Sequence, residues 1–333
     1  MTAASNQRGE RRPILAITLG DPAGVGPEVT LKALADPEIQ RSARFIVVGD
    51  RAAVSSAERS TGILLDGLPV EFRDCHALPP DASIAMGTLC AEYGAASVRY
   101  VHDATQMCLH GEADAMVTAP LNKEAVALNG IQFSGHTEYI AELCNATDSR
   151  MLLAGQRLSV VHVSTHISLR EACNLDTARI IRTIELGNEA MKLLGKPGPR
   201  IAVCGLNPHA GEHGLFGTED ERFILPAVEA CRARGIDCEG PVAPDTIFFR
   251  AANGSHDLIV AMYHDQGHIP MKLLDFDATV NMSLGIPILR TSVDHGTAFD
   301  IAGKNIAGAA NMKAAIRMAV TMARHRLQPA VTA

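Results

Sequence analysis

Three apolar runs in the second half of the chain each end in a polar segment that contains a histidine. Their length and their β-branched residues predict buried strands. The runs cover residues 158–165, 201–208 and 258–262, and the histidines that follow them are His166, His209 and His264. Buried residues followed by polar ones are typical of central parallel strands whose carboxyl ends carry a functional site.

The rest of the pattern alternates strand and helix candidates. Further strands are predicted at 13–18, 45–48 and 113–117, and helices at 176–194, 219–234 and 311–326. Lys123 follows the strand at 113–117 and has the length to reach a ligand from its loop. The repeated strand, loop, helix order predicts an α/β fold with a largely parallel sheet. A chain of 333 residues is long enough for one large or two medium domains.

The composition narrows the class of protein. Apolar residues make up 47% and charged residues 20%, which is usual for a soluble globular chain. The net charge of −7 argues against nucleic-acid binding, which normally shows a basic excess. It allows an anionic substrate, because a few placed Lys and Arg side chains make a pocket locally positive. No apolar run approaches the roughly 20 residues that span a bilayer, so we expect a cytoplasmic protein without membrane contacts.

The three histidines suggest a metal site. One histidine alone is more often a hydrogen-bonded loop residue, but three in matching positions after three strands favour metal binding. Imidazole suits Zn, Mn, Co or Ni, and three protein ligands leave positions open for a substrate. Asp265, beside His264, is either a partner that orients this histidine or a general base.

A second group of polar residues indicates anion recognition. Lys272, Asn281 and Arg290 follow the last of the three histidines within thirty residues, each beside an apolar segment. An ammonium, an amide and a fixed guanidinium are what phosphate or carboxylate recognition needs. His136 and Thr137 precede an apolar-periodic helix, where they form either an anion site or a simple cap made by Thr137.

The glycine-rich segment at 20–28, GDPAGVGPE, follows the first strand and leads into a helix at Pro27. Its spacing fits neither GxGxxG nor the phosphate-binding loop that ends in GK[ST]. We therefore expect tight backbone packing at the rim of the site rather than a grip on a dinucleotide.

The most specific string is SVDHGTAFDIAGKNIAG at 292–308. It resembles the loop on the adenine side of the cofactor in isocitrate and isopropylmalate dehydrogenases, whose pattern is close to HGSAPDIAGKNIANP. The resemblance implies cofactor contacts at His295, Gly296, Asp300, Ile301 and Asn305. The departures are Phe299, Gly308 and Ala309, of which Gly308 weakens the expected adenine contact. The carboxylate of Asp300 accepts from a ribose 2′-hydroxyl and repels a 2′-phosphate, which favours NAD.

Over almost its whole length the chain resembles the 4-hydroxythreonine-4-phosphate dehydrogenase (PdxA) family. The matching motifs are GDPAGVGPE, SGHTE, STHISLR, LNPHAGE, APDT, MYHDQG, VNMSLGIPILRTS and VDHGTA. The resemblance implies one divalent metal (Zn, Mg, Mn, Co or Ni) held by His166, His209 and His264, and substrate contacts at His136, Thr137, Lys272, Asn281 and Arg290. It also implies a homodimer in which one histidine ligand comes from the neighbouring subunit.

The implied fold is that of isopropylmalate dehydrogenase, with two α/β/α subdomains around a cleft. We place the first subdomain at 13–130 together with 290–333, so that it holds both termini. The second subdomain, at 131–289, then carries the metal and the dimer contacts.

One branch of the family acts on 4-phospho-D-threonate or 4-phospho-D-erythronate, and TAPLNKEA, HDQGHIPMKLL and HGTAFDIAG resemble that branch. The prediction is oxidation of a 4-phosphorylated four-carbon 3-hydroxy acid by NAD, with a divalent metal required, followed by decarboxylation to dihydroxyacetone phosphate and CO2. Asp245 or Asp265, or a water that they hold, is the predicted base. The alternatives are the dehydrogenase of 4-hydroxy-L-threonine 4-phosphate in pyridoxal phosphate biosynthesis and, more remotely, a metal-dependent phosphatase.

Overall fold

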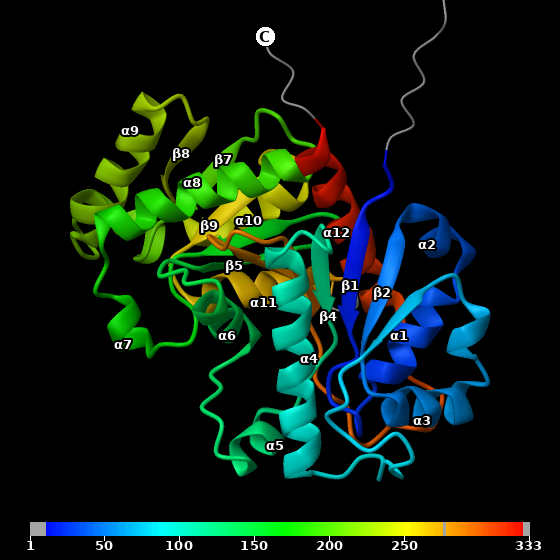
Figure 1. Ribbon diagram of the computed structural model, residues 1–333. Helices are drawn as coiled ribbons and strands as arrows, with labels where there is room; N and C mark the ends of the chain where they lie inside the picture. Colours follow the sequence, from blue (N-terminus) through cyan, green and yellow to red (C-terminus); the bar gives the residue numbers. More distant parts are fainter. Residues whose placement is uncertain (1–10, 276–277, 329–333) are drawn as a thin grey trace, which may run out of the picture.

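The computed structural model describes residues 11–275 and 278–328. Within them, one eleven-stranded sheet has the order β3-β2-β1-β4-β11-β10-β5-β6-β9-β7-β8 (Figure 1). The strands are β1 (Ile14–Thr18), β2 (Arg44–Gly49), β3 (Glu71–Asp74), β4 (Ala115–Thr118), β5 (Arg150–Ala154), β6 (Ser159–His162), β7 (Ile201–Cys204), β8 (Cys238–Val242), β9 (Leu258–Ala261), β10 (Val280–Leu284) and β11 (Arg290–Val293). The predicted strands are confirmed, and β3, β5, β8, β10 and β11 add to them.

Helices cover both faces of this sheet. The α-helices are α1 (Gly26–Leu34), α2 (Pro37–Ser42), α3 (Arg51–Thr61), α4 (Ala91–Leu109), α5 (Lys123–Leu128), α6 (His136–Leu143), α7 (Leu169–Ala172), α8 (Thr177–Leu193), α9 (Leu225–Ala233), α10 (Pro244–Ala252), α11 (His264–Leu274) and α12 (Ala310–Leu327). Short helical turns are η1 (Leu65–Gly67), η2 (Pro208–Gly211) and η3 (Asp220–Ile224). The predicted helices 176–194, 219–234 and 311–326 are confirmed as α8, η3 with α9, and α12.

In the first half of the chain, the order of the strands in the sheet reverses direction after β3. β1, β2 and β3 follow one another outward in the sheet, and the chain then returns through α4 to place β4 on the other side of β1. Because such crossovers are right-handed, reversal of direction places α1 and α3 on one face and α4 on the other. A reversal of this kind leaves a crevice beside β1 and β4, which is where open α/β sheets bind ligands.

The second half repeats this scheme around β6, β9, β7 and β8, which are parallel to one another. α8 and α9 pack together on one face and α10 and α11 lie over the other. The carboxyl ends of β6, β9 and β7 therefore lie at the same edge of the sheet, as the sequence predicts for strands that each lead to a histidine. Three neighbouring strands are followed by His166, His264 and His209 in that order.

Three antiparallel pairings lie in the middle of the sheet, and one of them, β11 with β10, joins the two halves. Seven of the ten strand pairings in the described residues are parallel, and the other three are β11 with β10, β10 with β5, and β5 with β6. The parallel strands of the second half thus run opposite to those of the first. Strands from 13–130 and 290–328 fill one side of the sheet and those from 131–289 the other. The subdomain boundary stays a prediction, and residues 329–333 lie outside the described part.

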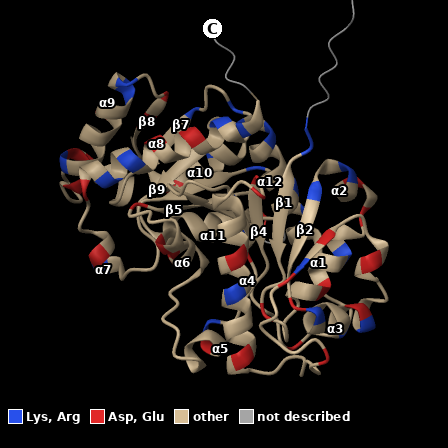
Figure 2. Ribbon diagram, viewed as in Figure 1, with Lys and Arg blue, Asp and Glu red and all other residues tan. Residues whose placement is uncertain are grey.

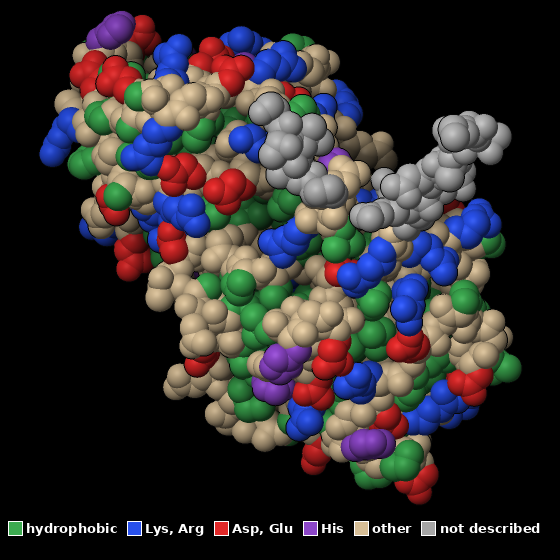
Figure 3. Space-filling model, turned by 45° about the horizontal axis from the view of Figure 1, so that its top comes forward, with side chains coloured by type: hydrophobic (Ala, Val, Ile, Leu, Met, Phe, Trp, Pro, Cys, Tyr) green, Lys and Arg blue, Asp and Glu red, His purple; other side chains and the backbone are tan. Residues whose placement is uncertain are grey.

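The two halves share a core. The largest cluster of buried apolar side chains includes residues of β1, β4, β9, β10 and α12, so it continues across the sheet. A smaller cluster lies between β5, β6, β7 and β9 and the helices α10 and α11. Figure 2 shows the charged residues mainly on the surrounding helices and loops, with few on the central strands. Acidic and basic side chains are interspersed over the face in Figure 3.

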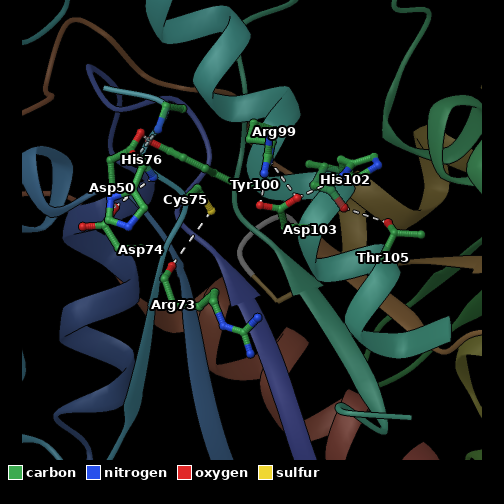
Figure 4. A network of polar contacts seen from close by, with 12 residues as sticks. Asp50, Arg73, Asp74, Cys75, His76, Arg99, Tyr100, His102, Asp103 and Thr105 are labelled. Atoms are coloured by element: carbon green, nitrogen blue, oxygen red, sulfur yellow. Dashed lines mark hydrogen bonds and ion pairs between the residues drawn. The ribbon is translucent and has the colours of Figure 1, made fainter. Parts of the chain in front are cut away.

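A polar network connects β2, the end of β3 and α4 in the first half, and Asp50 and Tyr100 are fully buried members of it (Figure 4). Asp50 follows β2, the position from which many dinucleotide-binding folds hold a ribose. Here its Oδ2 accepts from the hydroxyl of Tyr100 at 2.7 Å and its Oδ1 accepts from the backbone N–H of Ala77 at 2.8 Å. Burial raises the pKa of Asp50. Because both oxygens are engaged inside the protein, this carboxylate ties α4 to the loop after β3.

Candidate active site

One cavity of about 330 Å³ brings together most of the side chains that the sequence singled out. Both halves of the chain contribute to it: Lys123 and the segment Ser292–Gly296 from the first, and α6, α11 and β10 from the second. The predicted site residues that line it are His136, Thr137, His166, His264, Lys272, Asn281, Arg290, His295 and Gly296. Residues 130 positions or more apart therefore meet in one space.

Arg290 is the buried cation of this cavity, which Lys123 and Lys272 also line. It is 2% exposed, and its guanidinium donates to three hydroxyls: Thr118 at 2.7 Å, Ser283 at 3.1 Å and Thr137 at 3.4 Å. Burial lowers the pKa of Arg290 to about 9, and Glu138 acts in the opposite direction. Hydroxyls orient a guanidinium without neutralising it, so a bound anion would supply the missing countercharge.

Thr137 corrects one sequence-based alternative. α6 begins at His136, its N-cap is Gly135, and the cap position forms no side-chain hydrogen bond. Thr137 is therefore not the cap. Its hydroxyl instead lies 3.3 Å from that of Ser283, within the group that surrounds Arg290.

Two buried polar atoms in the cavity have no hydrogen-bond partner among the described residues. They are Nε2 of His136 and Oδ1 of Asn281. Burial, followed by the charges of Arg290 and Lys123, holds the pKa of His136 well below its usual 6.5, so its ring is neutral near pH 7. An unsatisfied buried polar group costs about 1–3 kcal/mol, which a ligand with complementary donors and acceptors removes.

Two imidazoles in the cavity are held as metal ligands are usually held. The ring centroids of His166 and His264 lie 5.9 Å apart. Nδ1 of His264 lies 2.6 Å from Oδ1 of Asp265, and Nδ1 of His166 lies 3.4 Å from Oε1 of Glu138. A carboxylate on Nδ1 fixes the proton there and leaves the lone pair of Nε2 for a cation. The hydrogen bond from His166 also lowers the pKa of Glu138.

Within one chain His209 does not join these two rings. It lies on η2 beyond β7, where its ring centroid is 6.1 Å from that of Phe216. Among the described residues of a single chain, no three His, Cys, Asp or Glu side chains are placed to hold a metal ion. The predicted three-histidine site therefore stays a prediction that needs a second source for its third ligand.

The backbone around His209 has an unusual conformation. Residues 209–214 all have positive φ, including four that are not glycine: His209 at 53°, Ala210 at 55°, Glu212 at 42° and His213 at 54°. This conformation costs roughly 1–2 kcal/mol for each L-residue other than glycine. Asp220 supports the loop by accepting from the N–H groups of residues 206 and 207 at 2.8 and 3.3 Å. Strain of this kind concentrates at functional sites, where the surrounding structure holds it in place.

A second cavity of about 440 Å³ adjoins the first, and His295 and Gly296 line both. Its other lining residues are largely apolar: Val25, Val29, Ala298, Ile301, Ala307, Gly308, Ala310 and Asn311. An apolar pocket beside a polar one suits a ligand with a flat base at one end and a reacting group at the other. Of the remaining predicted cofactor residues, Asp300 and Asn305 are exposed on the same loop and do not line the cavity.

The glycine-rich segment packs beneath this loop, as predicted. An added Cβ at Gly24 would lie 3.0 Å from Cβ of Thr297, and the N–H of Val25 donates to the carbonyl of Thr297 at 2.9 Å. At Gly20, where φ is 69°, a Cβ would lie 2.2 Å from the carbonyl oxygen of Pro120. The glycines thus permit close backbone contact with the two neighbouring loops.

Comparison with known proteins now gives the family. A family model described as "Pyridoxal phosphate biosynthetic protein PdxA" matches residues 34–319. The chain belongs to the PdxA family. It is 44% identical to "D-threonate 4-phosphate dehydrogenase" of Cupriavidus necator, over 94% of this chain and 98% of that protein. It is 46% identical to "4-hydroxythreonine-4-phosphate dehydrogenase" of Geobacter metallireducens, over 94% and 96%.

Solved structures confirm the fold. A 4-hydroxythreonine-4-phosphate dehydrogenase from Klebsiella pneumoniae matches with a TM-score of 0.82 and 40% identity, covering 93% of this chain and 99% of that one. A β-decarboxylating dehydrogenase from Thermococcus kodakarensis matches with a TM-score of 0.51 and 15% identity, over 92% of this chain and 82% of that one, which shows the fold alone. The predicted isocitrate/isopropylmalate dehydrogenase-like fold is thereby confirmed.

The two carboxylates predicted as base lie outside both cavities of this PdxA-family chain. Asp245 is exposed in the first turn of α10. Asp265 has a side chain that is 71% exposed, and its Oδ1 is engaged by His264. Of the two roles left open by the sequence, the geometry of Asp265 favours the one that orients the histidine. The role of either residue as a base stays a prediction.

Four further side chains in or next to the first cavity have contacts that the sequence did not predict. Glu138 holds His166 from the same motif as His136, and Asp294 pairs with Lys272 at 3.2 Å across the two halves of the chain. His268 lies directly behind His264, with ring centroids 3.6 Å apart and planes 10° apart, and the buried His162 lies 4.6 Å from His268. Position in a known motif was the available signal for Glu138, Asp294 and His268.

We expect the stability of this protein to fall as the pH is lowered from about 6.5 toward 4. Burial lowers the pKa of His162 to about 3 and that of His268 to about 4, so both rings stay neutral in the folded protein while the unfolded chain protonates them. Between its folded and unfolded pKa values, each such histidine lowers the free energy of unfolding by about 1.4 kcal/mol for every unit by which the pH falls. Burial raises the pKa of Asp21 to about 6, which has the opposite effect.

Urea denaturation of the metal-free wild type and of H162Q at several pH values measures this dependence. Gln does not titrate. The slope of the unfolding free energy against pH should therefore be smaller in H162Q, by the amount that corresponds to the uptake of about one proton on unfolding. Equal slopes in the two proteins would exclude His162 as a source.

Proposed function

We propose that this chain is a cytoplasmic, NAD-dependent and divalent-metal-dependent dehydrogenase. Its substrate is 4-phospho-D-threonate or 4-phospho-D-erythronate, and its products are dihydroxyacetone phosphate and CO2. The observation that carries the proposal is a single cavity that holds a buried guanidinium and two carboxylate-bound imidazoles and adjoins an apolar pocket. The name of the Cupriavidus necator relative supports the substrate class.

The phosphate is proposed to bind at Arg290 and Lys272, with His136 and Thr137 at the start of α6. The guanidinium supplies charge and direction through hydroxyls that keep it in place. The first turn of α6 adds backbone N–H groups at the positive end of the helix. The unpartnered oxygen of Asn281 is proposed to accept a hydrogen bond from a substrate hydroxyl. The ionised carboxylate and phosphate of the substrate cannot take this role, because their oxygens have no proton to donate.

The donor set fits a divalent metal. His166 and His264 present Nε2 while Glu138 and Asp265 hold the opposite ring nitrogens. When bound, the metal polarises the hydroxyl to be oxidised and stabilises the charge that develops as CO2 leaves. His209 is proposed to complete the site from the neighbouring subunit. The metal is proposed to be Zn, Mg, Mn, Co or Ni.

The reaction balances as a two-electron oxidation followed by loss of CO2. The hydride of C3 would pass to NAD, which supplies the oxidising chemistry, while a base takes the proton of the C3 hydroxyl. Asp245, or a water that it holds, is proposed as that base, while Asp265 keeps its contact with His264. The resulting 3-keto acid carries its carboxylate on C2, so the C1–C2 bond breaks to give CO2 and an enolate that is then protonated.

A homodimer is proposed to complete the site. Large apolar side chains are exposed next to the relevant residues: Ile167 follows His166, Ile269 and Leu273 are on α11, and Leu215 and Phe216 lie on the loop of His209. Their exposed fractions range from 46% for Phe216 to 81% for Leu273. Exposed apolar patches around a site support a protein contact there.

The test is an assay of NADH formation with three substrates and a metal series. 4-Phospho-D-threonate and 4-phospho-D-erythronate are compared with 4-hydroxy-L-threonine 4-phosphate, each with NAD or NADP and with Zn, Mg, Mn, Co or Ni. We expect NADH and CO2 from the two acids, less with NADP, and none after chelation. Release of inorganic phosphate without NADH would overturn the proposal.

A second candidate is the dehydrogenase of 4-hydroxy-L-threonine 4-phosphate in pyridoxal phosphate biosynthesis. The relative from Geobacter metallireducens carries that name at 46% identity, slightly above the threonate enzyme at 44%. 4-Hydroxy-L-threonine 4-phosphate carries an amino group at C2 where 4-phospho-D-threonate carries a hydroxyl, and the two are otherwise alike. A higher kcat/KM for the amino compound in the same assay would select this candidate.

A further inference from the structure

Two charged residues of α1 bind the backbone of the loop that lines the second cavity. Glu28 is 1% exposed, and its Oε1 accepts from the N–H of Ala307 at 3.0 Å and from Nζ of Lys32 at 2.8 Å. Its other oxygen, Oε2, is buried without a partner in the described residues. The carboxylate therefore acts through one oxygen, which is shared between the loop and the neighbouring lysine.

Lys32 binds the same turn from its carbonyl side. Its Nζ donates to the carbonyl of Ala307 at 2.9 Å and to that of Asn305 at 3.1 Å. Together the ion pair satisfies one N–H and two C=O groups within residues 305–307. Asn305 has a φ of 58°, a conformation that L-residues adopt at a cost unless the surroundings fix it.

The same helix also forms part of the cavity itself. Val25, just before α1, and Val29 on its first turns line the cavity, and Ala307 and Gly308 line it from the loop. One rigid element thus carries one wall and holds the other through Glu28 and Lys32. The distance between these walls is set by a pair of side chains that do not themselves line the cavity.

We propose that Glu28 and Lys32 are positioning residues that keep the apolar cavity open to the width of an aromatic base and so determine affinity for NAD. This inference rests on the proposed function, in which NAD occupies the cavity. It also gives the segment at 20–28 a role: its glycines bring the helix close to Thr297, and Glu28 and Lys32 then fasten residues 305–307. The effect passes through backbone atoms, so the two side chains touch no part of the cofactor.

The test measures three quantities in K32M and E28Q: the Kd for NADH, the KM for NAD and the KM for the phospho-acid. NADH binding is followed by nicotinamide fluorescence without metal or phospho-acid, so it does not depend on turnover. We expect K32M to raise the Kd for NADH and the KM for NAD by about tenfold or more, because about 1.4 kcal/mol corresponds to a factor of ten. The KM for the phospho-acid should stay within about twofold, because Arg290 and Lys272 are on other elements. E28Q should behave like K32M, whereas K32R, which keeps the cation, should regain most of the affinity.

K313M is the matched control. Lys313 on α12 pairs with Asp36 at 2.8 Å, is partly buried as Lys32 is, and lines neither cavity. It should lose a similar ion pair while keeping wild-type affinity for NADH. Wild-type affinity in K32M, the same loss in K313M, or an equal rise of both KM values would overturn the inference and leave the proposed function standing. A wild type that does not bind NADH would overturn both.

Discussion

Replacing His264 or His209 with alanine is expected to lower kcat/KM for the phospho-acid by a factor of about 10³ or more. A metal that polarises the reacting oxygen supplies several kcal/mol of transition-state stabilisation, and each 1.36 kcal/mol is a factor of about ten. His264 faces the cavity and is held there by Asp265, so its loss removes a ligand that is already oriented. Metal content by elemental analysis and NADH formation measure the two parts of the effect. NADH binding should be largely retained, because His295 and Ile301 lie in the adjoining cavity.

A mixture of the two variants tests whether the site is shared. If His209 serves the partner's site, a heterodimer of H209A and H264A has one complete site and one that lacks two ligands. Random assortment of equal amounts then restores about a quarter of the wild-type activity, as follows from an isologous dimer. If all three histidines act within one chain, mixing restores nothing. H213A is the control, since His213 lies on the same loop as His209 and is exposed; its kcat/KM should stay within about threefold of the wild type.

Replacing Arg290 with methionine is expected to raise the KM for the phospho-acid by about 100-fold or more. Methionine fills much of the same volume but removes the cation that faces the anion site, a charge-assisted contact of about 1.5–3 kcal/mol for each bond. The free energy of unfolding should change less than such a buried substitution suggests, because a guanidinium held only by hydroxyls is itself costly to bury. Steady-state kinetics and urea denaturation measure the two effects.

K123M provides the comparison for this prediction. Lys123 lines the same cavity but comes from a surface loop at the start of α5. The K123M substitution should raise the KM for the phospho-acid only by about threefold, because an exposed charge is screened by water and salt. Equal effects in K123M and R290M would mean that general positive charge, rather than the fixed guanidinium, binds the phosphate.

The sequence alone predicted the parts that depend on local order along the chain. Apolar runs of strand length gave β1, β2, β4, β6, β7 and β9, and helical periodicity gave α8 and α12. Most of the residues predicted to bind an anion or a metal line one cavity, and their roles there stay predictions. The spacing of GDPAGVGPE predicted tight backbone packing, and the close approach of Gly24 to Thr297 confirms that packing. These signals are local, since each needs only neighbours within about ten residues.

Other features follow from contacts between distant segments, which periodicity does not encode. The hydroxyl of Thr137 was predicted as a possible cap, but it joins Ser283 and Arg290 because β10 and β11 pass beside α6. Glu138 and Asp265 engage the two histidines, and Glu28 and Lys32 hold residues more than 270 positions away. Whether an acidic side chain is a base, an orienting partner or a support depends on which groups surround it, and only the folded chain brings those groups together. The sequence therefore determined the strands and helices with a clear apolar pattern and the candidate residues in their motifs. The tertiary structure decided which groups surround each of those residues, because hydrogen bonds and desolvation act over a few ångströms of space whatever the separation along the chain.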